Sequence, residues 1–157
     1  MPLLTFSVAL SLLLLLSVSN YAIMATPVAA ERALNFFSIV GKLKTLKRTG
    51  WVDNEISLPE SVADHMYRMS MLNFALVDPT LDKDRLIKIC LCHDLAEAIA
   101  GDITPTERSG VSKEEKRKLE KNALNEIIAD LDHAALGEEI RVLWLEYVHT
   151  NRVPHVL

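Results

Sequence analysis

Cysteine is scarce in this chain of 157 residues, which has only Cys90 and Cys92. The two stand so close along one segment that, in a helix, their side chains would point to nearly opposite sides. We therefore expect no disulfide between them and interpret both as reduced core thiols, which agrees with a reducing compartment. A fold held together by disulfides is excluded, and neither thiol is favoured as a metal ligand.

Positive charge is also in short supply, because 17 Lys and Arg stand against 21 Asp and Glu, a net charge of −4. A broad nucleic-acid interface needs an excess of basic residues, so we expect no nucleic-acid polymer as a partner. Alternating strand patterns, internal repeats and low-complexity tracts are absent as well. The length suits one domain.

One long apolar run lies at the amino terminus, from Leu3 to Val18. It has the length of a signal-peptide core, is short for a membrane span, and lacks the basic residue that normally opens a signal peptide. A soluble-looking stretch then begins at Met24. Residues 1–23 could be a secretory signal or anchor, a buried helix, or an extension of a protein that natively starts near Met24. We predict a cytoplasmic location, with secretion or membrane association only if this segment is retained for it.

Apolar residues recur at helical spacing from Pro27 onward. The first predicted helix begins at Thr26-Pro27 and ends at the Thr49-Gly50 break, and residues 51–59 are predicted to form a loop. Its expected apolar face consists of Leu34, Phe36, Phe37, Val40, Leu43 and Leu46.

The second predicted helix starts at Ser61, because Asp64 three positions later completes a capping-box pattern. Asp82 can cap a third helix that runs to about Ala100, where Gly101 stops it. The expected buried stripe of the second helix consists of Val62, Met66, Met69, Leu72 and Leu76.

Ser112 and Glu115 form another capping-box pair and start a charged fourth helix. A last amphipathic piece covers residues 137–148, where Trp144 should anchor it in the core. The predicted fold is therefore all-α, an irregular helical bundle. The expected core residues of the fourth helix are Leu119, Ala123, Ile127 and Leu131.

The segment HDLAEAIAGDITP, residues 93–105, places ionisable side chains in the apolar pattern of the third helix. In a continuous helix His93 and Glu97 share a face, whereas His93 and Asp94 diverge by roughly 100° around the axis. An imidazole and a carboxylate can still converge on one cation, and they suit Mn²⁺, Fe²⁺, Co²⁺ or Zn²⁺. His65, near the start of the second helix, is the candidate for a further ligand.

Each of these residues also has an ordinary structural interpretation. His65 could be a capping or hydrogen-bonded histidine, Glu97 a solvated helix residue, and Asp102 a turn former beside Gly101. The residues alone leave both interpretations open.

The combination of segments resembles the HD-domain superfamily of metal-dependent phosphohydrolases, and within it the 5′-deoxynucleotidases. The resemblance rests on PESVADHMYRM (59–69) followed by HDLAEAIAGDITP (93–105). Three further segments fit in the same order: LKTLKRTGW (43–51), SKEEKRKLE (112–120) and LWLEY (143–147). It spans roughly residues 30–147, so we place a partial HD domain at residues 24–147.

The resemblance implies a divalent cation such as Mn²⁺, Co²⁺ or Mg²⁺. It assigns His65, His93 and Asp94 to the first metal site. The groups that it assigns to a second cation or to the catalytic water are Glu97, Asp102 and the backbone carbonyl of Ile103.

The implied reaction converts deoxyribonucleoside 5′-monophosphates to deoxynucleosides and phosphate. Arg48 would neutralise the phosphoryl oxygens, and Trp51 would pack against the sugar or base. Glu97 would orient or deprotonate the attacking water, while Asp102 would either bind a cation or protonate the leaving oxygen. The family resemblance also implies a homodimer.

The sequence departs from the family pattern after Tyr147. The family has a further aspartate ligand on a later helix, but the tail VHTNRVPHVL, residues 148–157, contains no aspartate. We interpret this tail as a divergent, shortened end and expect the last helices of the bundle to be missing. The loss would weaken metal binding and expose an apolar groove.

Two classes of function therefore stay open. One is an active 5′-deoxynucleotidase, with another HD nucleotide phosphohydrolase or phosphodiesterase as the alternative enzyme. The other is a catalytically impaired HD-fold module that binds nucleotides or proteins.

Overall fold

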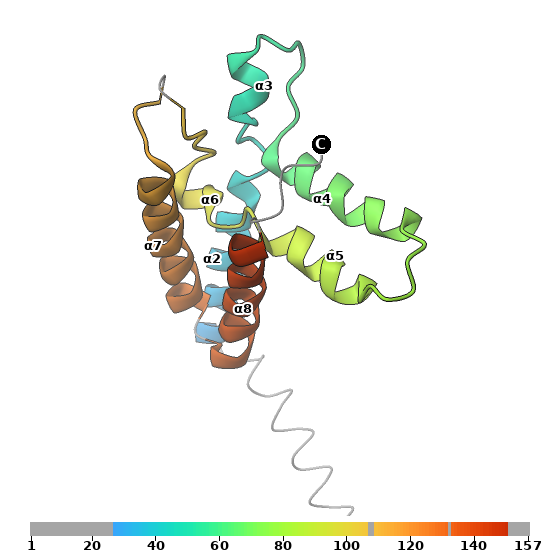
Figure 1. Ribbon diagram of the computed structural model, residues 1–157. Coiled ribbons are helices and arrows are strands. Elements are labelled where there is room, and N and C mark those ends of the chain that lie inside the picture. The colour runs from blue at the N-terminus through green and yellow to red at the C-terminus, as the bar shows by residue number, and fades with distance from the viewer. Residues whose placement is uncertain (1–26, 107–108, 132, 151–157) are drawn as a thin grey trace, which may run out of the picture.

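The computed structural model describes residues 27–106, 109–131 and 133–150, and the regular structure in these ranges is helical (Figure 1). The one pairing of extended chain in them is an isolated antiparallel bridge between Lys47 and Ser61. This confirms the predicted all-α class. The elements are α2 (Pro27–Lys42), α3 (Thr49–Asp53), α4 (Val62–Leu72), the 3₁₀ helix η1 (Asn73–Ala75), α5 (Lys83–Cys92), α6 (Glu97–Ala100), α7 (Lys113–Leu131) and α8 (Ala134–Thr150).

The helices form two groups, which are joined where α5 contacts α8 (Figure 1). In one group α2 packs against α7, and α7 against α8; in the other α4 packs against α5, which also contacts α8. Helix α6 contacts both α2 and α7. The core lies between these elements and includes Leu43, Val62, Met66, Leu95, Ala96, Ala123, Leu124, Ile127, Ile140 and Trp144.

Polar side chains cap three of the helices where the sequence predicts them. Ser61 forms a reciprocal capping box with Asp64 at the start of α4. Asp82 accepts a hydrogen bond of 3.0 Å from the backbone N–H of Arg85 at the start of α5. Ser112 Oγ accepts a hydrogen bond of 3.1 Å from the backbone N–H of Glu115, before α7.

The prediction of one continuous helix up to Ala100 is wrong, because α5 ends at Cys92 and α6 begins only at Glu97. Between them the N–H of Leu95 donates to the carbonyl of Cys92, and that of Glu97 to the carbonyl of Asp94, each three residues back. Such tightened turns change the direction in which successive side chains point. Here they allow the adjacent side chains of His93 and Asp94 to be buried together.

The segment after Arg48 also differs from the prediction of a break and a loop. Thr49 and Gly50 begin the short helix α3, because the Arg48 carbonyl accepts hydrogen bonds from the N–H groups of Trp51 and Val52. The chain then passes through Glu55 and Leu58, both with positive φ. Hydrogen bonds from Thr49 to Asp102 hold this helical turn next to the loop after α6.

The predicted apolar faces are only partly buried. Leu43, Val62 and Met66 lie in the core as expected, and Trp144 is 3% exposed. The helices α2, α4 and α7 pack on one side, so apolar residues on their other sides stay exposed. The residues wrongly expected to be buried are Leu34, Phe37, Leu72, Leu76 and Leu119.

None of the helices in the described ranges has the length and apolar character needed to cross a membrane. The predictions for residues 1–23, and for residues 151–157 of the tail, fall outside the described part of the chain.

Gly137 provides a test of the packing between α7 and α8. A Cβ atom at this position would lie 2.6 Å from Cγ2 of Ile128, a branch close to the backbone of α7. We expect Gly137→Ala to lower the free energy of unfolding by about 1–3 kcal/mol, measured by chemical denaturation. Gly41→Ala is the control, because a Cβ there meets nothing within 4 Å; it should be neutral or raise stability by up to about 1 kcal/mol. Equal losses in both variants would contradict this packing.

Candidate metal centre

Three potential metal ligands converge where α4 meets the end of α5. His65 comes from the first turn of α4, and His93 and Asp94 come from the turn after α5. One ligand atom from each residue lies within 4.8 Å of those of the other two. The structure therefore brings together the three residues predicted for the first metal site.

The buried His93 side chain presents an unpaired nitrogen to this cluster. Its Nδ1 lies 2.9 Å from the carbonyl oxygen of Cys90, which can only accept, so we assign the ring proton to Nδ1. Nε2 then carries the lone pair, is buried, and has no hydrogen-bond partner in the described part of the chain. Asp94 Oδ2 lies 3.1 Å away. An imidazole nitrogen without a hydrogen-bond partner and a neighbouring carboxylate oxygen together form a set of ligand atoms that fits a divalent cation.

Charges around Asp94 favour its ionised form. Burial raises the pKa of Asp94, but the Arg48 guanidinium group, which donates to Asp94 Oδ2, acts in the opposite direction, and the pKa lies below its usual value. The pKa of His65 is lowered by burial and by the charge of Arg48. Ionised Asp94 and neutral His65 are the forms that bind cations.

Arg48 lies directly beside the three clustered residues. Its Nη1 donates a hydrogen bond of 3.2 Å to Asp94 Oδ2 and lies 3.7 Å from Asp102 Oδ2. Asp102 Oδ2 also accepts a hydrogen bond of 2.7 Å from the N–H of Thr49, and the Thr49 hydroxyl donates to the Asp102 carbonyl. Asp102 therefore ties the start of α3, and with it Arg48, to the loop after α6.

Glu97, the first residue of α6, is 2% exposed. Its Oε1 lies 3.3 Å from Lys116 Nζ, while its Oε2 is buried without a hydrogen-bond partner among the described residues. Burial, aided by the charges of Asp94 and Asp102, raises the pKa of Glu97 to about 9. Glu97 can therefore hold a proton at neutral pH.

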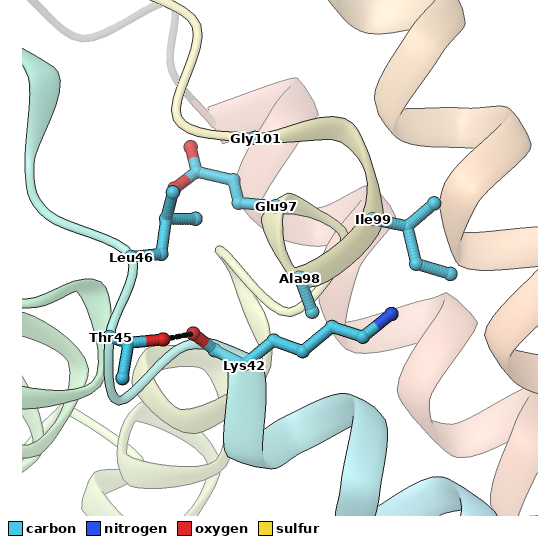
Figure 2. A pocket seen from close by; sticks show the side chains of 7 residues that line it. All are labelled: Lys42, Thr45, Leu46, Glu97, Ala98, Ile99 and Gly101. Carbon is cyan, nitrogen blue, oxygen red and sulfur yellow. Dashed lines mark hydrogen bonds between the residues drawn. The ribbon is translucent and has the colours of Figure 1, made fainter.

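A pocket of about 360 Å³ opens onto Glu97 (Figure 2). Figure 2 shows the Glu97 carboxyl group near Leu46, while the side chain of Lys42 passes beneath Ala98. The pocket gives access to Glu97 without involving the three clustered ligands. Its lining residues are Lys42, Thr45, Leu46, Glu97, Ala98, Ile99 and Gly101.

Trp51 and Ile103, the other predicted site residues, lie on the segments that flank Arg48 and Asp102. The Trp51 side chain is 41% exposed, and its Nε1 donates a hydrogen bond of 3.0 Å to Glu60 Oε1. The same oxygen lies 3.9 Å from His65 Nδ1, so Glu60 links the segment of Trp51 to His65. Ile103 follows Asp102 and is half-buried; the role of its carbonyl stays a prediction.

Most of the chain matches a known protein family. Residues 40–153 match the family described as HD domain. The chain belongs to the HD domain family. Its curated relatives include the 5′-deoxynucleotidase HDDC2 of Dictyostelium discoideum, which is 51% identical over 122 residues that cover 73% of this chain and 63% of the relative. The human 5′-deoxynucleotidase HDDC2 is 43% identical over 118 residues, covering 75% and 56%.

This HD domain chain thus spans about six-tenths of the length of the curated relatives it matches. Among solved structures, a protein described as a predicted metal-dependent phosphohydrolase from Magnetospirillum magnetotacticum superposes with a TM-score of 0.62. It is 24% identical, and the match covers 78% of this chain and 61% of that one. That likeness shows a shared fold.

Besides Thr49 and Glu60, the HD domain has further residues that contact the predicted site and were missed at the sequence level. Lys116 reaches Glu97 from α7, and the ring of Tyr147 on α8 packs against His93 with centroids 4.7 Å apart. Lys116 stands four positions before Glu120, a spacing that indicated only a solvated ion pair on one helix. The one signal for Tyr147 was its place in the LWLEY segment.

The raised pKa of Glu97 predicts a pH-dependent stability of the metal-free protein. Its carboxyl group titrates near 4.5 when unfolded and near 9 when folded. The folded state therefore binds the extra proton between these values, and stability falls as the pH rises through this window. Glu97→Gln cannot ionise, so it should gain about 1–3 kcal/mol relative to wild type between pH 5 and 8.

Urea unfolding with EDTA at several pH values measures this difference. Glu114→Gln, an exposed change on α7, is the control and should follow the wild type. A Glu97→Gln curve parallel to the wild-type curve would show that burial does not shift this carboxyl group.

Proposed function

We propose that this HD domain hydrolyses deoxyribonucleoside 5′-monophosphates to deoxynucleosides and inorganic phosphate, using a divalent cation. The observation that carries the proposal is the convergence of His65, His93 and Asp94, with the buried Nε2 of His93 left without a hydrogen-bond partner. The 5′-deoxynucleotidases among the curated relatives support this substrate class.

The three clustered residues would hold the cation. Two imidazoles with one carboxylate favour Mn²⁺ or Co²⁺ over Mg²⁺, which prefers oxygen ligands and retained waters. When bound, the cation supplies a Lewis acid that polarises phosphoryl oxygens and makes a neighbouring water more acidic.

Arg48 would bind the phosphate. Its guanidinium group already lies 3.2 Å from Asp94 Oδ2, so it stands at the edge of the metal centre. It retains N–H donors for the phosphoryl oxygens, and its fixed charge matches a phosphomonoester dianion. Asp102, held by the Thr49 N–H group, would keep the guanidinium group in this place.

Glu97 would handle the proton, because its raised pKa of about 9 keeps it protonated at neutral pH and it stands only three residues after Asp94. Oε2, the oxygen without a partner, would donate its proton to the leaving 5′-oxygen, and the resulting carboxylate would take up the proton that the attacking water releases. Asp102 and the carbonyl of Ile103 would contribute to a second cation if one binds. The half-exposed ring of Trp51 would pack against the sugar or base.

The direct test is phosphate release from deoxyribonucleoside and ribonucleoside 5′-monophosphates with Mn²⁺, Co²⁺ or Mg²⁺. We expect turnover of the deoxyribonucleotides, together with Mn²⁺ binding measured by calorimetry. His93→Ala should abolish both, because it removes the buried donor. His149→Ala, on the exposed part of α8, is the control and should change neither. A folded wild-type chain that binds no metal and releases no phosphate would instead indicate a catalytically impaired module.

The role of Arg48 gives a separate prediction. Arg48→Ala should lower kcat/KM by about 10²–10³-fold, as expected for the loss of a charged donor to the reacting group. Inorganic phosphate should also inhibit the variant less. Arg117→Ala removes an exposed arginine on α7 and should have no effect. An unchanged kcat/KM in Arg48→Ala would exclude Arg48 from phosphate binding.

A further inference from the structure

We infer that Lys116 is a positioning residue that orients the Glu97 carboxyl group, an inference that rests on the proposed function. Lys116 stands near the start of α7, and its Nζ lies 3.3 Å from Glu97 Oε1 and 2.9 Å from Glu120 Oε1. Its side chain is 22% exposed, so the ammonium group lies between two helices and not on an open helix face.

This hydrogen bond matters because α6 is short, and the helix fixes the backbone of Glu97 but not the orientation of its carboxyl group. This helix has four residues, and Glu97 is the first of them. Within the described part of the chain, Lys116 donates the hydrogen bond that reaches the Glu97 carboxyl group. Without this bond the carboxyl group could rotate about its terminal torsion, which is broad for a glutamate side chain.

The same contact distinguishes the two carboxyl oxygens of Glu97. An ammonium group only donates, so Oε1 serves as its acceptor and the proton of a neutral carboxyl group belongs on Oε2. Oε2 is the oxygen that is buried without a partner. Lys116 therefore fixes which of the two oxygens has a partner and which is left for other contacts.

Lys116 is itself held in place by the helix on which it lies. Helix α7 runs for 19 residues and packs against α6. Glu120, one turn further along α7, accepts a second hydrogen bond from the same ammonium group and is 13% exposed. A long helix thus holds Lys116, and Lys116 holds the carboxyl group of a short one.

The kinetic test compares kcat with KM. Lys116→Met should lower kcat by about 10- to 100-fold through misplacement of Glu97. The KM for the deoxyribonucleotide should stay within about twofold, because Lys116 touches neither Arg48 nor the clustered ligands in any described contact. Lys116→Arg should restore much of kcat, since it keeps the charge and the donors.

Lys118→Met is the matched control, because Lys118 is exposed on the same helix. It should leave kcat and KM unchanged, and circular dichroism should confirm that all variants are folded. An unchanged kcat in folded Lys116→Met, or kcat and KM that change together, would overturn the inference.

A second test does not depend on activity. Thermal unfolding with EDTA is measured for Lys116→Met in the wild-type chain and in Glu97→Met, whose side chain has similar length but no acceptor. Lys116→Met should lower Tm at least about twofold more in the wild-type chain, where Glu97 is present, than in the Glu97→Met chain. Equal losses would overturn the inference. If the wild-type chain releases no phosphate, the proposed function fails, and this cycle alone decides whether Lys116 holds Glu97.

Discussion

The burial of His93 and Asp94 at consecutive positions is the constraint on which the rest of this structure depends. Adjacent residues of an α-helix point about 100° apart, and here tightened turns direct both side chains toward the same interior. The chain therefore ends α5 at Cys92, passes through tightened turns and restarts as α6. The Cys90 carbonyl then fixes the ring proton of His93 on Nδ1 and leaves Nε2 facing Asp94. A buried donor set of this kind calls for a cation.

Basic residues from distant parts of the chain balance the buried carboxyl groups. Arg48, just before α3, pairs with Asp94, and Lys116, from α7, pairs with Glu97. The contact with Lys116 joins the short helix α6 to the long helix α7, and Asp102 accepts a hydrogen bond from the N–H of Thr49 at the start of α3. The charges therefore also hold the elements of the site together. The opposite shifts in the pKa of Asp94 and Glu97 follow from this arrangement, because Asp94 has strong partners whereas burial dominates at Glu97.

Acid–base chemistry beside a metal centre benefits from two carboxyl groups whose pKa values are shifted in opposite directions. A carboxylate that stays ionised can bind a cation, and a neighbouring carboxyl group with a raised pKa can carry a proton at neutral pH. The HD domain places the two groups three residues apart, on either side of the turn between α5 and α6. Figure 1 shows how short α6 is, and Figure 2 shows Glu97 among the residues that line a pocket.

The sequence by itself determined the helical class and the caps at Ser61, Asp82 and Ser112, because each depends on local spacing. It also predicted that His65, His93 and Asp94 come together, because they lie in recognisable segments. Only the tertiary structure decided the break after Cys92 and the exposure of Leu34 and Phe37, since a helical period does not reveal which neighbours cover a face. It also decided the pairing of Glu97 with Lys116, 19 positions apart. A hydrogen bond between two helices depends on how they pack, and a local sequence pattern does not show how they pack.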